Sequence, residues 1–202
     1  LDASADTLIL EDDKDLKIFR ETNDRYESNE FLILTVTDKN KDIFANETLE
    51  YIQNLSLEIQ NFAGVQSVTA ITNIPLVSSS KKPLTELINN IPNIFSKDID
   101  PEHAQQEILT SPIYKDLVIS EDAKTTAMQV ILKKNAAFKE ALLKRELSYK
   151  KYQQDASFET QYLLSKQEYD NISDNQKKNI SNLIKDIRKV QAKYTSDRYE
   201  IR

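Results

Sequence analysis

Residues 31–71 decide the fold and read FLILTVTDKNKDIFANETLEYIQNLSLEIQNFAGVQSVTAI. Residues 31–37 are rich in large apolar and β-branched side chains without helical spacing, which predicts a buried strand. Residues 46–62 predict an amphipathic helix, because apolar side chains recur every three or four positions at Leu49, Ile52, Leu55, Ile59 and Phe62. Gly64 is then expected to be a left-handed helix cap, and residues 65–71 predict a second strand. A crossover of this length suits two parallel strands of one sheet.

A proline-bearing insertion follows the second strand. All five prolines of the chain lie within residues 72–124. The sequence Asp100-Pro101-Glu102 predicts a helix start, because aspartate caps a helix and proline suits its first position. Residues 117–119 and 125–132 predict two strands of a β-hairpin with a longer loop.

The last third of the chain is predicted to be helical. A long helix is expected from Asn135 to about Tyr169, with a kink or a break at residues 153–158. The sequence Ser173-Asp174-Asn175-Gln176 matches a capping box and predicts a second helix, followed by a strand over residues 198–202. A helix of about 33 residues is about 50 Å long, so the middle of this helical pair is expected to project from the body.

This order of elements predicts an α+β fold with a ferredoxin-like βαββαβ core. We expect the body to comprise residues 1–132 and 174–202, interrupted by the insertion at residues 72–124. Residues 133–173 are expected to form a helical arm that continues into the helix 174–195. Because position 1 is Leu and the chain ends inside a predicted strand, we expect a soluble piece of a longer protein.

Composition argues against several functional classes. The chain has 202 residues with 27 basic and 33 acidic side chains, a formal net charge of −6 that argues against nucleic-acid binding. It has no cysteine, one histidine and one glycine, which excludes thiolate chemistry, imidazole metal clusters and glycine-rich phosphate loops. We therefore expect no cofactor, no metal and no catalytic residue, and a hydrolase stays open only if the fold joins a serine to a base.

Charge and tyrosine are unevenly distributed. Residues 1–132 carry 11 basic and 23 acidic side chains, whereas residues 133–202 carry 16 basic and 10 acidic ones. The basic part could attract acidic lipid headgroups or the acidic half of a neighbouring subunit, but a solvated helix face is the favoured account. Four tyrosines of the arm are the candidate contacts with a substrate or partner: Tyr149, Tyr152, Tyr162 and Tyr169. The favoured alternative is that these tyrosines pack between two antiparallel helices.

Other polar residues are weaker candidates. His103 is expected to be a surface residue in the first turn of its helix rather than a proton switch. The acidic clusters at residues 11–13 and 121–122 are expected to be solvated turns, since neither has the spacing of a calcium loop. The first cluster precedes a short helix predicted from Asp13 to about Tyr26. Asn46, Asn54 and Asn171 are among the residues that begin glycosylation motifs.

Several stretches resemble the first extracytoplasmic loop of the resistance-nodulation-division (RND) superfamily, in its branch of MMPL-type exporters. In chain order they are DASADTL (2–8), EDD (11–13), FLIL (31–34), IF (43–44), ETL (47–49), GVQSVT (64–69), SPIY (111–114), LVIS (117–120) and KTTA (124–127). IKDIR (184–188) with Tyr194 is similar to the helix that closes this loop. The resemblance covers about residues 2–132, and residues 136–172 resemble only a charged helix. Ala123 stands where the family's hairpin turn usually has Gly.

The resemblance implies a periplasmic porter-like domain between the first and second transmembrane helices of an inner-membrane transporter. Such a domain would bind or guide an apolar or amphipathic substrate, often a lipid, and would not be an enzyme. The implied partners are the transmembrane helices and second periplasmic loop of the same transporter, with a homo-oligomer also considered. The carboxylates that couple energy lie in the membrane in that family, so no catalytic residue is carried over. The alternative is a non-enzymatic interaction module whose helical hairpin recruits a partner.

Overall fold

The computed structural model describes residues 30–40, 43–80, 83 and 91–202, together with Asp15, Ile18 and Thr22. The chain divides into two compact units, Leu1–Glu30 and Phe31–Arg202. Apart from those three residues, the helix predicted from Asp13 to Tyr26 lies outside the described part of the chain.

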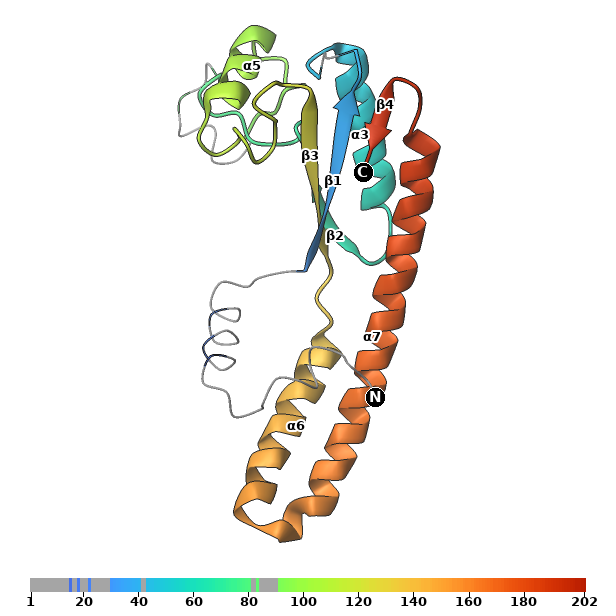
Figure 1. Cartoon of the computed structure of the whole chain (residues 1–202). Helices are drawn as coiled ribbons and strands as arrows, with labels where there is room; N and C mark the ends of the chain where they lie inside the picture. The colour runs from blue at the N-terminus through green and yellow to red at the C-terminus, as the bar shows by residue number, and fades with distance from the viewer. Residues whose placement is uncertain are drawn as a thin grey trace. The chain divides into compact units, whose positions relative to one another are not determined.

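The second unit is built on an antiparallel sheet (Figure 1). Its strands within the described residues are β1 (Phe31–Asp38), β2 (Val65–Thr69), β3 (Thr125–Leu132) and β4 (Tyr199–Ile201). They lie in the order β2-β3-β1-β4, and every neighbouring pair is antiparallel. β1 and β2 therefore run in the same direction on either side of β3. The predicted α+β class and the predicted strands 31–37, 65–71, 125–132 and 198–202 are confirmed, with small differences at their ends.

Helix α3 (Asn46–Gln60) connects β1 to β2 and packs against β2 and β3. Four of the apolar residues that predicted it are buried: Leu49, Ile52, Leu55 and Ile59. The prediction for Gly64 is wrong, because no described glycine has a positive φ and α3 ends at Asn61 in right-handed conformation. Gly64 instead allows a close approach, since a Cβ there would lie 2.9 Å from Cδ2 of Leu183.

The insertion after β2 contains α5 (Pro101–Thr110), which begins as predicted. The Asp100 carboxylate accepts hydrogen bonds from the backbone N–H groups of Glu102 and His103, at 3.0 and 3.1 Å. The predicted strand at residues 117–119 is wrong, because Ile119 makes only isolated bridges to Lys115 and Thr126. Ser111–Ile119 is held by local turns instead.

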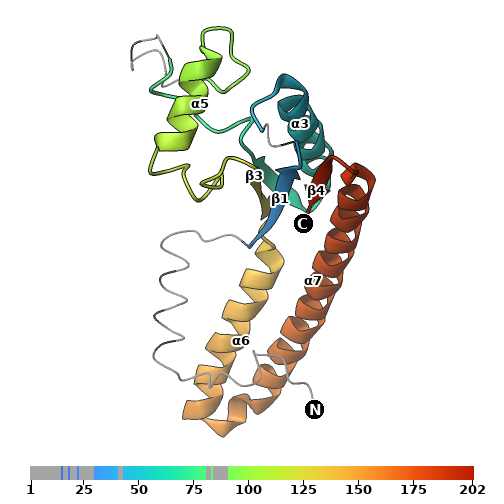
Figure 2. The same cartoon turned by 45° about the horizontal axis from the view of Figure 1, so that its top comes forward.

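The helical arm consists of α6 (Ala136–Gln154), the 3-10 turn η1 (Ala156–Phe158) and the first half of α7 (Glu159–Tyr194). In Figures 1 and 2, α6 and α7 lie side by side. The break predicted at residues 153–158 is confirmed, so residues 136–172 form two helices. The predicted helix end near Tyr169 and the capping box at Ser173 are wrong, because both residues lie inside α7 and are buried. No Gly or Pro interrupts this stretch, and packing against neighbouring elements stabilises a long polar helix.

The core lies between α3, α7 and one face of the sheet. Alternating side chains of β1 and β3 point into it, among them Val36, Met128 and Val130. On the other face, Phe31 and Ile33 are more than half exposed. None of the helices in the described ranges combines the length and the apolar character required of a membrane span.

Candidate functional site

The contact between α6 and α7 is unusually polar for a helix pair. At its centre the hydroxyl of Ser148 is hydrogen-bonded to that of Ser165, and both residues are buried. Ala141 and Ser173 are the other small buried residues of the arm. Small side chains let two helix backbones approach closely, but they bury little apolar surface. The arm is therefore held by shape and polar contacts more than by an apolar core.

Three of the four predicted tyrosines meet at the tip of the arm. The rings of Tyr149 and Tyr162 are 5.2 Å apart between centroids, and those of Tyr152 and Tyr162 are stacked at 5.6 Å. Beside them, the Lys151 ammonium lies 5.9 Å from the centroid of the Phe158 ring. The three tyrosines are half-buried, so each keeps part of its surface open to solvent.

Tyr169 lies further from the tip, on the inner side of the arm. It is buried, its ring is 5.4 Å from that of Phe138, and the Arg145 guanidinium lies 4.4 Å above it. The structure thus brings Tyr149, Tyr152 and Tyr162 together and places Tyr169 in a separate packing contact. All four pack between the helices, as the favoured alternative predicts, and contact with a substrate stays a prediction.

The outer surface of the arm carries exposed apolar side chains. They are about half exposed or more and lie on both helices: Leu143, Leu147, Leu163 and Leu164. A solvated helix normally shows polar residues on its outer face, so these leucines mark a surface suited to a partner.

The middle of α7 forms a shallow groove of about 370 Å³. Six of the described residues line it: Lys177, Ile180, Ser181, Ile184, Lys185 and Arg188. Two isoleucines form an apolar floor between three cationic side chains. The sequence shows that residues 133–202 are basic, but it does not show that these cations gather around apolar residues.

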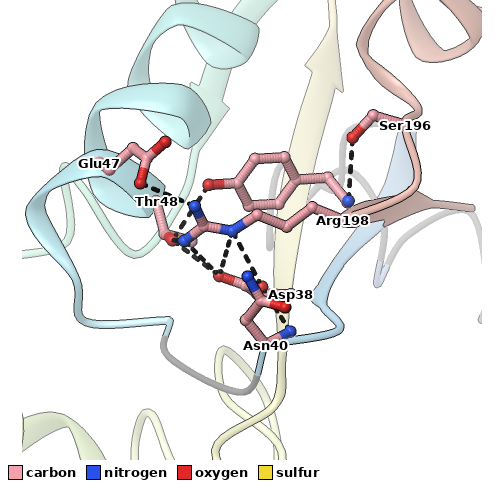
Figure 3. Close-up of polar contacts among 7 residues, drawn as sticks. Asp38, Asn40, Glu47, Thr48, Ser196 and Arg198 are labelled. Carbon is pink, nitrogen blue, oxygen red and sulfur yellow. Dashed lines mark hydrogen bonds and ion pairs between the residues drawn. The ribbon is translucent and has the colours of Figure 1, made fainter.

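A buried ion pair joins the two ends of the second unit (Figure 3). Asp38 at the end of β1 is 0% exposed, and the side chain of Arg198, just before β4, is 27% exposed. The guanidinium donates to Asp38 at 3.1–3.3 Å and to Glu47 at 2.7 Å. The Thr48 hydroxyl donates to the Asp38 carboxylate at 2.8 Å. This network ties β1, the start of α3 and β4 together.

Its electrostatics fit a structural role. Burial raises the pKa of Asp38, but hydrogen bonds from Arg198, the Asn40 N–H and Thr48 outweigh it and leave the pKa below its ordinary value. Next to it, Tyr51 stacks on Tyr199 with centroids 3.9 Å apart. Burial and the neighbouring tyrosines raise the pKa of Tyr51 to about 12, so its hydroxyl stays protonated at neutral pH. No local motif could reveal this network, because Asp38 and Arg198 are 160 positions apart.

The remaining polar candidates are surface groups. His103 is exposed and lies in the first turn of α5, 4.0 Å from Asp100. Glu121 and Asp122 lie in an exposed turn, where Asp122 accepts from the Ser120 hydroxyl at 2.7 Å. Within the described part of the chain, His, Asp and Glu residues nowhere gather into a group that could hold a metal ion. The cluster at residues 11–13 lies outside that part.

Comparison with known proteins adds no assignment, because no protein-family model, curated protein or solved structure matches the chain.

Proposed function

We propose that the chain is the extracytoplasmic porter-type domain of an RND/MMPL-type membrane exporter, where it binds or guides an apolar or amphipathic substrate. The observation that carries the proposal is the interleaving of the strands. β1 and β2 run in the same direction and are joined through α3, while β3 lies between them. β3 and β4 also run in the same direction and are joined through the arm, while β1 lies between them.

Two interleaved units of this kind are the signature of a split βαβ sheet, so we assign the body to the ferredoxin-like topology. In this assignment, residues 72–124 are an insertion between β2 and β3, and residues 133–173 extend the second crossover into an arm. Both additions fall at connections between strands, where a core tolerates extra chain. The order of the elements predicted from the sequence leads to the same topology.

The open face of the sheet suits an amphipathic substrate. Phe31 and Ile33 are exposed near one end of β1, and Phe31 is paired with Ile131 of β3. Towards the other end, Thr37 is paired with Thr125, and their hydroxyls are 2.8 Å apart. The face thus changes from apolar to polar along one strand, as a molecule with an apolar body and a polar end requires.

The gene around this segment tests the proposal. We expect about 20 consecutive apolar residues directly before Leu1 and a cluster of hydrophobic helices after Arg202, since a bilayer span needs about that length. A stop codon or a second water-soluble domain at those positions would contradict it.

A second candidate function is a non-enzymatic interaction module that recruits a partner through the arm. The exposed leucines of α6 and α7 favour it, because they offer apolar contacts on a solvated hairpin. The same gene sequence distinguishes the two, because the module requires no membrane helices around it.

A further inference from the structure

The turn at residues 111–119 presents two strongly exposed apolar side chains. Ile113 is 67% and Leu117 is 70% exposed, the highest values among the large apolar residues that the structure describes. A single exposed leucine is ordinary on a protein surface, but two such residues four positions apart on one turn form a small apolar patch.

This patch is held in place by its own turn. Tyr114 between the two residues is buried, and its hydroxyl donates to the carbonyl of Pro75. The N–H of Val118 donates to the Tyr114 carbonyl at 2.8 Å. Asp116 has a φ of 63°, which is costly for a residue with a side chain and persists only where surrounding contacts impose it. The apolar side chains are therefore fixed outward by a strained, well-bonded turn.

Acidic residues lie within this turn and directly after it in the chain. Asp116 and Glu121 are exposed and form no ion pair with any other described residue, whereas Asp122 lies 3.4 Å from Lys124. Lys115 is the cation within the turn itself. We call residues 113–122 the acidic turn.

The groove in α7, which we call the basic groove, has the complementary character. Lys177, Ser181, Ile184 and Arg188 follow one another at intervals of three and four, so they form a line about 16 Å long on one side of the helix. Within the described part of the chain, Lys177, Lys185 and Arg188 form no ion pair. Three free cations beside an isoleucine floor suit an apolar surface that carries carboxylates.

We infer that the acidic turn of one molecule docks into the basic groove of a second copy of this chain. Ile113 and Leu117 would cover the isoleucine floor, and Asp116 and Glu121 would face the groove's cations. The two segments belong to one folded unit, and in Figures 1 and 2 the chain following α5 lies away from α7, so a second copy is needed to join the two surfaces. The contact is heterologous and would build rings or open chains. It does not depend on the proposed transport function.

Sedimentation velocity of the 202-residue chain at rising concentration tests the inference. We expect the unaltered chain to associate in low salt and to dissociate as salt rises. A turn variant, Ile113→Ser with Leu117→Ser, and a groove variant, Lys177→Glu with Lys185→Glu, should each weaken association by more than about tenfold. A control, Lys134→Glu with Lys150→Glu, makes the same charge change at exposed lysines outside α7 and should leave association unchanged.

Mixing the two variants gives the sharpest outcome. The turn variant keeps an intact groove and the groove variant keeps an intact turn, so together they should form a one-to-one dimer although neither associates alone. Circular dichroism of each variant confirms that it is folded. Three results would overturn the inference. The unaltered chain could stay monomeric, the mixture of the two variants could stay monomeric, or the control variant could associate as weakly as the groove variant. The inference would also be overturned if the groove variant lost binding to vesicles with acidic lipids while its self-association stayed unchanged.

Discussion

Arg198→Ala should be among the most destabilising single changes in the second unit. It removes the guanidinium that faces Asp38, and Asp38 is 0% exposed, so its charge cannot be solvated in place. Removing one partner of a buried ion pair costs about 3–5 kcal/mol. The guanidinium has two other acceptors. The Thr48 hydroxyl keeps its own hydrogen bond to Asp38, and Glu47 is 76% exposed and returns to water at little cost. We therefore expect a loss of about 4 kcal/mol, which lowers Tm by about 8–16 °C in a domain of this size.

Urea denaturation followed by circular dichroism measures this loss. Arg202→Ala is the matched control, because Arg202 forms an exposed ion pair with Glu200 in the same C-terminal segment and should cost less than about 1 kcal/mol. The pKa of Asp38 lies below its ordinary value in the folded chain. Its stabilising effect is therefore complete above the unfolded carboxyl pKa of about 4 and is lost as pH falls through the folded pKa.

In the variant, burial without the guanidinium should raise the pKa of Asp38 instead. The Arg198→Ala variant then loses stability as pH rises from the pKa of Asp38 in the unfolded chain to its raised pKa in the folded chain. The difference between the two proteins should be largest at pH 7 and should shrink towards pH 3. Equal stability of Arg198→Ala and Arg202→Ala at pH 7, or a difference independent of pH, would refute the reasoning.

Three further changes test other parts of the fold. Gly64→Ala should change the free energy of unfolding by less than about 1 kcal/mol, because its Cβ would lie 2.9 Å from Cδ2 of Leu183, the movable end of that side chain, and any cost should disappear in a Leu183→Ala background when both are measured by urea denaturation. Ala123→Gly should stabilise by about 1 kcal/mol in the same assay, since Ala123 has a φ of 54°. Glu107→Gln should speed hydrogen exchange of the backbone N–H groups at residues 77–79, because the Glu107 carboxylate accepts from all three at 2.7–3.1 Å, and unchanged exchange would contradict this contact.

The sequence was sufficient to predict the four strands of the sheet and helix α3 because their signals are local. Strand β1 and helix α3 each show the periodicity of the structure they form, and Asp100-Pro101 marks a helix start by its own chemistry. The predictions for Gly64 and Ser173 were wrong for a common reason. Each rested on a local preference, whereas contact with a distant segment decides the conformation: Leu183 lies against Gly64, and packing buries Ser173 inside α7.

The surfaces were harder to predict. The tyrosines of the arm were identified from composition, but their division into a cluster at the tip and a buried contact at Tyr169 depends on where the chain turns at residues 155–158. The acidic turn and the basic groove each combine apolar and charged residues whose exposure follows from tertiary packing. Neither has a spacing that distinguishes it from a solvated helix or loop in the sequence.

The side of the membrane on which this chain lies tests the account most directly. The segment has no cysteine, so Ser157→Cys, at the exposed turn of the arm, provides a single thiol once any cysteines elsewhere in the full-length protein are replaced. We expect the full-length protein to be found in the membrane fraction. A membrane-impermeant maleimide should label it in intact cells whose outer membrane has been permeabilised. Labelling only after cell lysis, or recovery of the full-length protein in the cytosolic fraction, would contradict an extracytoplasmic transporter domain.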